Sequence, residues 1–232
     1  MNGNVEEIYR EIRARCKGTL LRPLDAGYDR AAPVWNGMHD GKPSILVRCK
    51  DVDDIRTCLR VAVESNIVTA VRCGGHSLAG SSTCDNGLVI DLSALREVQV
   101  DPDGRRARFG GGCLLGTVDS ATQKVGLAFP AGVVSHTGAG GLVLGGGTGW
   151  LNRLYGLSCD NVEGFRLVAA DGSVVHATAR ETPDLFWALR GGGGNFGIVT
   201  EFEVRLHPVT DGMKATQLWG SQPVSERWPD HG

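Results

Sequence analysis

Residues 71–80 of this chain read VRCGGHSLAG. A glycine pair permits backbone conformations and close approaches that other residues do not tolerate. His76 follows the pair directly, so it would touch whatever the backbone approaches there. A histidine in a loop is most often an ordinary loop residue, and the surrounding sequence has to decide what His76 does.

The residues before this loop predict a strand, a helix and a second strand. Residues 44–49 (SILVRC) form a short apolar run, and residues 69–72 form another. Between them, Asp51 can cap a helix in which the apolar residues of 52–63 recur on one face. The two strands of such a unit are parallel. The loop that contains His76 therefore lies at the carboxyl edge of a parallel sheet, where open α/β sheets bind ligands.

The rest of the chain predicts a mainly antiparallel arrangement. Strand patterns occur at 88–92, 98–100, 107–109, 165–170, 173–177 and 198–206, and helix patterns at 115–125 and 184–190. Turn sequences at 101–104 (DPDG) and 171–172 (DG) join neighbouring strands into hairpins. A small parallel unit followed by an antiparallel one is an α+β fold.

Composition and charge narrow the class of protein. The chain has 232 residues, of which 41% are hydrophobic, enough for a sizeable core. Its 24 basic and 26 acidic residues give a formal net charge of −2, which argues against a nucleic-acid or anionic-membrane partner. No stretch has the apolar length of a membrane span, and the first residues lack the apolar core of a secretory signal.

The seven cysteines form no Cys-x-x-Cys pair and no Cys/His cluster with zinc-ligand spacing. An odd number of cysteines without a secretory signal fits reduced thiols better than a disulfide framework. We therefore expect a cytoplasmic protein without a metal site.

The 34 glycines are concentrated in blocks at 74–75, 110–112, 138–141, 145–149 and 191–194. Two familiar motifs fail on their context. Residues 192–197 match G-x-G-x-x-G, but they follow a predicted helix and precede a strand, the reverse of a dinucleotide-binding fingerprint. The block at 145–149 lacks the Lys-Ser/Thr of a phosphate loop. No Gly-x-Ser-x-Gly sequence supplies a hydrolase nucleophile.

Three blocks together carry a resemblance to a known family. They are VRCGGHSLAG (71–80), FPAGVVSHTGAGGLVLGGGTGWLNRLYGLSCDN (129–161) and DLFWALRGGGGNFGIVTEFEV (184–204). In this order they resemble the FAD-binding domain of the vanillyl-alcohol-oxidase (PCMH) type, and within it the berberine-bridge and hydroxynicotine-oxidase branch. The resemblance covers 43–209, leaving a helical or irregular lead-in at 1–42 and an irregular tail at 210–232.

The resemblance implies a role for His76. In that family the histidine after the glycine pair is joined covalently to the 8α-methyl group of the flavin. The chemistry agrees, because a neutral imidazole is a nucleophile and the loop's backbone N–H groups could face the pyrophosphate. The other FAD contacts that the resemblance implies are Arg72, Cys73, Gly74, Gly75, Ser77, Gly80, Gly132, Thr137, Gly138, Gly141, Gly145, Gly146, Gly147, Gly149, Asp160, Asn161, Gly197, Ile198 and Val199.

One departure from the family concerns the number of covalent links. Many members of this branch carry, in the second block, a cysteine that is bound to flavin C6. Val134 occupies that place here, so we expect a single link through His76. His136 is the next candidate for a flavin neighbour.

Two functions remain open. Family members continue into a second domain that covers the flavin and supplies the substrate pocket, and no match to it follows residue 209. The chain is then either an FAD-dependent oxidoreductase that accepts hydride from a small organic substrate, with oxygen as an electron acceptor, or a flavin-binding module without turnover of its own. In either case we expect the uncovered flavin face to favour self-association or binding of a partner chain.

Overall fold

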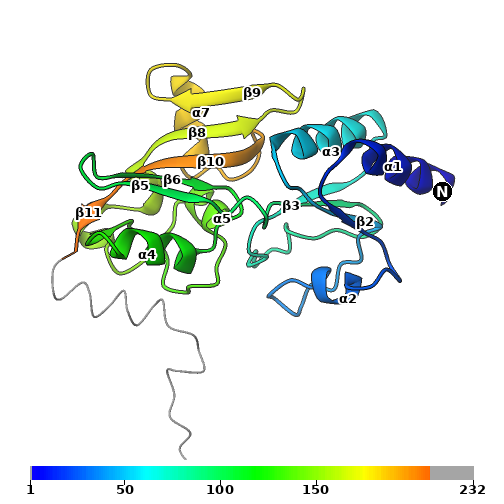
Figure 1. Cartoon of the computed structure of the whole chain (residues 1–232), viewed down its shortest axis with the longest axis horizontal. Coiled ribbons are helices and arrows are strands. Elements are labelled where there is room, and N and C mark those ends of the chain that lie inside the picture. Colours follow the sequence, from blue (N-terminus) through cyan, green and yellow to red (C-terminus); the bar gives the residue numbers. More distant parts are fainter. Residues whose placement is uncertain (1, 210–232) are drawn as a thin grey trace, which may run out of the picture.

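The computed structural model describes residues 2–209, with side chains from residue 5 onward. The expectation for the tail at 210–232 lies outside the described residues. Two sheets lie side by side, one in each half of the molecule (Figure 1). The α+β prediction is confirmed: one sheet is mainly parallel and the other is antiparallel.

The first half is built on a four-stranded sheet in the order β1-β2-β4-β3. Its elements are α1 (Asn2–Arg15), β1 (Thr19–Leu21), α2 (Tyr28–Ala31), β2 (Ile45–Arg48), α3 (Val52–Glu64), β3 (Thr69–Arg72) and β4 (Leu88–Asp91). Strands β2 and β3 have the same direction, as predicted, but each pairs with β4, which lies between them. Strand β1 adds an antiparallel edge that the sequence patterns did not indicate.

Helix α3 forms where its cap and its apolar face predict it. The Asp51 side chain accepts a hydrogen bond from the Asp54 N–H at 3.1 Å, which satisfies one free donor of the first turn. Ile55 and Val61 on its inner face are buried against the sheet. Ile12 of α1 is buried in the same core, so the N-terminal helix packs onto this half.

The second half is built on a five-stranded antiparallel sheet in the order β5-β6-β10-β8-β9. Its strands are β5 (Val98–Asp101), β6 (Arg106–Gly110), β8 (Val162–Val168), β9 (Val174–Thr178) and β10 (Ile198–Arg205). Alternation places Phe109, Phe165 and Phe202 on one face, where the ring centroids of Phe109 and Phe202 lie 5.1 Å apart. Helices α4 (Leu115–Gln123) and α7 (Pro183–Leu189) contribute to this core.

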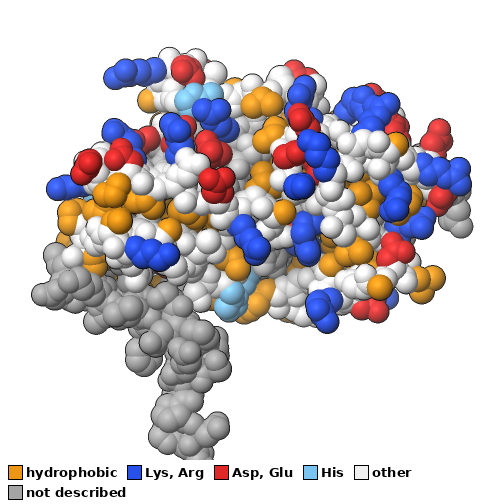
Figure 2. Space-filling model, viewed as in Figure 1, with side chains coloured by type: hydrophobic (Ala, Val, Ile, Leu, Met, Phe, Trp, Pro, Cys, Tyr) orange, Lys and Arg blue, Asp and Glu red, His pale blue; other side chains and the backbone are white. Residues whose placement is uncertain are grey.

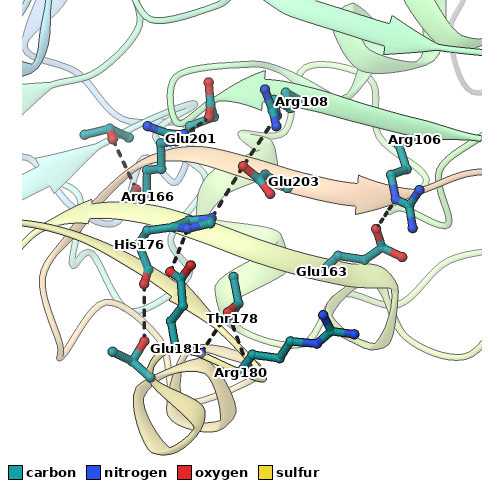
Figure 3. Close-up of polar contacts among 12 residues, drawn as sticks. Arg106, Arg108, Glu163, Arg166, His176, Thr178, Arg180, Glu181, Glu201 and Glu203 are labelled. Carbon is teal, nitrogen blue, oxygen red and sulfur yellow. Dashed lines mark hydrogen bonds and ion pairs between the residues drawn. The ribbon is translucent and has the colours of Figure 1, made fainter. Parts of the chain in front are cut away.

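The opposite face of the antiparallel sheet carries cross-strand ion pairs. Glu201 Oε1 lies 3.1 Å from Arg166 Nε, and Glu203 Oε1 lies 3.4 Å from Arg108 Nε (Figure 3). Charges of both signs are interspersed over the face seen in Figure 2. Such partly exposed pairs contribute little stability each, and this face fits a solvated surface rather than a site for a polyanion.

The second glycine-rich block does not fold as one continuous loop. It contains α5 (Ala139–Leu144), α6 (Asn152–Tyr155) and a short 3-10 helix, η1 (Ser158–Asn161). Two small strands, β7 (Leu127–Ala128) and β11 (His207–Pro208), pair beside it. No helix within residues 2–209 combines the length and the apolar character needed to cross a membrane.

Candidate functional site

The loop after β3 presents backbone donors at the predicted sheet edge. Gly75 adopts φ +69°, a left-handed conformation that glycine tolerates best. The N–H groups of Gly75, His76 and Ser77 donate to no other residue in the described part of the chain. Successive free amides around a left-handed residue form a concavity that suits an anionic group.

Arg72 anchors the base of this loop. Its guanidinium donates hydrogen bonds to the carbonyl oxygens of Ala31, Ala32 and Ser82. The residue is buried, and burial lowers its pKa from the ordinary arginine value. Arg72 was predicted to contact FAD, but in this structure its donors are engaged by the protein's own backbone.

The segment just before β2 holds the outer side of the loop, which the sequence patterns did not indicate. The Trp35 ring stacks on the His76 ring, with centroids 4.9 Å apart and an interplanar angle of 16°. The Trp35 N–H donates to the Gly75 carbonyl at 3.0 Å. His39 Nε2 lies 2.9 Å from the Leu78 carbonyl oxygen. No local motif marks these residues, because their role depends on a contact across about forty residues of chain.

His76 meets a second histidine from the other half of the molecule. Its Nε2 lies 2.7 Å from Nδ1 of His136, and its Nδ1 lies 3.5 Å from the Thr137 hydroxyl oxygen. Partial burial lowers the pKa of His76, and the nearby His136 lowers it further. The imidazole of His76 is therefore held mainly neutral, the form that can act as a nucleophile.

The first and second blocks touch directly beside this pair. A Cβ on Gly138 would lie 2.4 Å from the Gly74 amide nitrogen, so the two backbones are in close contact. Cys73 donates its S–H to the Cys113 carbonyl oxygen at 3.3 Å. Burial raises the pKa of Cys73 to about 11, so its thiol is protonated at neutral pH.

The glycines predicted to contact FAD between α5 and α6 are Gly145, Gly146, Gly147 and Gly149. The carbonyl oxygens of Gly146 and Gly147 accept hydrogen bonds from the N–H groups of Cys159 and Ser158. The Gly149 N–H donates to the Asn152 side chain at 3.0 Å. These bonds shape the connection between α5 and η1.

Asp160 and Asn161 stabilise the same connection from within. The buried Asn161 side chain donates through Nδ2 to the carbonyls of Tyr155 and Leu157, and its Oδ1 lies 2.7 Å from His207 Nε2. The Asp160 carboxylate accepts the Leu157 N–H at 2.8 Å. Both side chains act here within the protein, and their predicted contact with FAD stays a prediction.

Two predicted positions join the halves. Ile198 is buried in the core of the first half, and Val199 is buried in the core of the second. Gly197 precedes them at the start of β10. The side chains of Ile198 and Val199 are used in packing, and both residues pair with β8. Their predicted contact with FAD stays a prediction.

Three further predicted positions lie around the two blocks. The Ser77 hydroxyl accepts the Ser81 N–H at 3.0 Å, and Gly80 lies against the His39 ring. Gly132 faces the Leu142 side chain. Gly141 in α5 differs from them, because a Cβ built there would meet no described atom within 4 Å.

Comparisons with known proteins place this geometry in a family. A family model described as "FAD binding domain" matches residues 43–178. The chain is 40% identical over 210 residues to (R)-6-hydroxynicotine oxidase of Paenarthrobacter nicotinovorans, covering 90% of this chain and 46% of that protein. It is 40% identical over 206 residues to an FAD-linked oxidoreductase of Dictyostelium discoideum, covering 88% of this chain and 45% of that protein.

Solved structures agree with this fold. The crystal structure of 6-hydroxy-D-nicotine oxidase from Arthrobacter nicotinovorans aligns with a TM-score of 0.82 at 41% identity, covering 83% of this chain and 43% of that one. Glucooligosaccharide oxidase from Acremonium strictum, described with a 6-S-cysteinyl, 8α-N1-histidyl FAD, aligns with a TM-score of 0.83 at 31% identity, covering 88% of this chain and 43% of that one. The chain thus spans less than half the length of each of these relatives.

Proposed function

This chain belongs to the FAD binding domain family, and on that premise we propose that it holds FAD through one covalent bond to His76. The observation that carries the proposal is the loop at 73–80. It combines a neutral imidazole with three successive amide donors that no described residue uses, at the carboxyl edge of β3. This donor set fits a group that has both an electrophilic ring and an anionic phosphate.

Several residues support the loop in this role. Arg72 fixes its base through three backbone carbonyls, and Trp35 covers one face of the His76 ring. When bound, FAD supplies an acceptor for a hydride and carries the two electrons onward. Val134 brings no thiol to the second block, so the proposed attachment is single.

We propose an oxidoreductase activity: oxidation of a small organic substrate, with oxygen as the electron acceptor. The names of the relatives support this, since they are oxidases and FAD-linked oxidoreductases. A second candidate is a flavin-binding module that turns over only with another chain over the flavin. The groups gathered around the loop at 73–80 suit a cofactor, and none of them is assigned to a substrate.

The covalent proposal is tested by the intact mass of the denatured protein, purified after expression with ample riboflavin. We expect one FAD adduct on the wild type and none on His76→Ala. The matched control is His176→Ala, on the outer face of the antiparallel sheet (Figure 3), which should keep the adduct. An unmodified wild-type mass would contradict a covalent link.

The activity is tested separately. Under nitrogen, a substrate of the enzyme would bleach the yellow flavin absorbance, and oxygen would restore it. A yellow protein that no candidate alcohol or amine bleaches would support the module and contradict independent turnover.

A further inference from the structure

We infer that His136 is a positioning residue for flavin attachment: its Nδ1 accepts the Nε2–H of His76, so that His76 presents its other nitrogen, Nδ1, to the flavin methyl group. This inference rests on the proposed function. What it adds is a residue that selects the reacting nitrogen.

The geometry limits how the two rings can share protons. The 2.7 Å between His76 Nε2 and His136 Nδ1 is a full hydrogen bond, and such a bond between two neutral imidazoles needs one N–H. A neutral imidazole carries its proton on one nitrogen. If Nε2 of His76 donates to His136, then Nδ1 of His76 keeps a lone pair and is the nucleophile.

The surroundings of His76 Nδ1 agree with this assignment. The nearest side-chain polar atom on that side is the Thr137 hydroxyl oxygen, at 3.5 Å, the limit of a hydrogen bond. Nδ1 is thus only weakly engaged, whereas Nε2 is held tightly. The weakly engaged nitrogen is the one free to form a new bond.

The ring is also held in orientation from two sides. Trp35 stacks on His76 almost in parallel, and the His136 ring is inclined to His76 at 45° with its centroid 4.7 Å away. Because these contacts come from residues before β2 and after β7, rotation of the His76 ring would break both. Positioning of this kind lowers the entropy cost of reaching the reacting geometry.

The attachment step balances as follows. A bond forms between His76 Nδ1 and the methyl carbon, one methyl C–H bond breaks, and the imidazole loses its N–H proton from Nε2, through the hydrogen bond to His136. The electron pair released reduces the flavin, and molecular oxygen takes up that pair with two protons to give hydrogen peroxide. The linked imidazole is neutral again, with its lone pair on Nε2.

Two variants of the same residue separate positioning from bulk structure. His136→Leu replaces the imidazole with an apolar side chain of similar size and so removes the Nδ1 acceptor. His136→Asn places a carbonyl oxygen near the position of Nδ1, where it can still accept the Nε2–H. Each protein is prepared with little flavin and mixed with FAD in air. The covalent fraction is then followed by the mass of acid-denatured samples, and total bound FAD by absorbance before denaturation.

We expect His136→Leu to bind FAD but to attach it about tenfold to a hundredfold more slowly, the cost seen when a partner that fixes the orientation of a metal-bound histidine is removed. His136→Asn should recover most of the wild-type rate. Equal attachment rates for His136→Leu and wild type would overturn the inference while leaving the proposed function intact. If His136→Leu does not fold, the comparison of His136→Asn with wild type decides, and an Asn variant as slow as His76→Ala would overturn it.

Other results of the same experiment would contradict the proposed function itself. Wild-type protein that binds no FAD would contradict the proposed function and this inference together. Wild-type protein that binds FAD without forming an adduct would contradict the covalent link and the role of His136, and would leave FAD binding standing.

Discussion

Gly74 and Gly138 meet backbone to backbone: a Cβ on Gly74 would lie 2.3 Å from the Gly138 amide nitrogen, and one on Gly138 would lie 2.4 Å from that of Gly74. The contact joins the loop after β3 to the start of α5, and thus joins the two halves of the molecule at the candidate site. It brings His76 and His136 within hydrogen-bond distance across 60 residues of chain.

This contact predicts a large cost for one added methyl group. In Gly138→Ala the Cβ would press on backbone, which cannot rotate away, so we expect about 2–3 kcal/mol of destabilisation. Gly141→Ala, within the helix that Gly138 precedes, is the matched control, since its Cβ would meet no described atom within 4 Å; alanine is also the better helix former. Urea denaturation of the FAD-free proteins measures both. Equal stability of Gly138→Ala and Gly141→Ala would contradict the close backbone contact between Gly74 and Gly138.

The hydrogen bonds of the buried Arg72 side chain predict that FAD affinity depends on this residue. Lysine cannot donate to three separated carbonyls in the geometry of a guanidinium. Arg72→Lys should therefore leave some of the carbonyl oxygens of Ala31, Ala32 and Ser82 unpaired, costing about 2 kcal/mol or more. It should also weaken FAD binding, because the amides of residues 75–77 lose their fixed arrangement. Arg60→Lys, which alters an exposed pair with Glu11, is the control. Fluorescence titration of FAD measures the change, and equal affinity for both variants would contradict the anchoring role.

Asp119 predicts a pH dependence of stability. Burial in α4 raises its pKa to about 7, and no cation pairs with it in residues 2–209. Between about pH 4, the ordinary pKa of an aspartate, and pH 7, the unfolded chain releases this proton while the folded chain keeps it. The stability of the fold therefore falls as the pH rises through that window. Asp119→Asn should therefore be more stable than wild type at pH 8, by up to about 4 kcal/mol.

The same two proteins should have similar stability at pH 3, where Asp119 is largely protonated in both the folded and the unfolded state. Thermal unfolding at both pH values checks the difference between the variants. Asp103→Asn, in an exposed turn, serves as the control, and a gain at pH 8 of the same size in both variants would contradict the assignment to Asp119.

The position of Val134 predicts that a cysteine thiol placed there can form the covalent link to FAD in place of His76. The resemblance places a flavin-bound cysteine at this position in many relatives, and Val134 is partly exposed. In a His76→Ala background, we expect Val134→Cys to restore covalent retention of FAD in the denatured protein. Val133→Cys in the same background is the neighbouring control and should not restore it. Intact mass after denaturation reads out both, and equal retention would argue against the placement of Val134.

Local sequence patterns predicted most elements of the fold correctly. The helix after Asp51 forms because its cap and its apolar spacing agree, and the hairpin at Asp171-Gly172 forms because the turn residues suit the strands on either side. The patterns did not predict that β4 lies between β2 and β3. Strand order depends on which apolar faces pack together across distant segments, and local periodicity carries no information on that.

For the candidate site, too, the sequence predicted one part and the tertiary structure was needed for the other. Residue types and spacing were sufficient to select the loop around His76 and the second block, because glycines and a histidine at a sheet edge have a local chemical meaning. The tertiary structure alone decided that His136 Nδ1 meets His76 Nε2, that Trp35 stacks on the imidazole, and that Arg72 and Asn161 use their donors within the protein. The His76–His136 contact exists only because the two halves pack together, whereas Trp35 and Arg72 contact segments of the first half that are distant in the sequence. The bonds of Asn161 are local but depend on the fold of its own loop. A hydrogen bond exists only once both partners have been positioned.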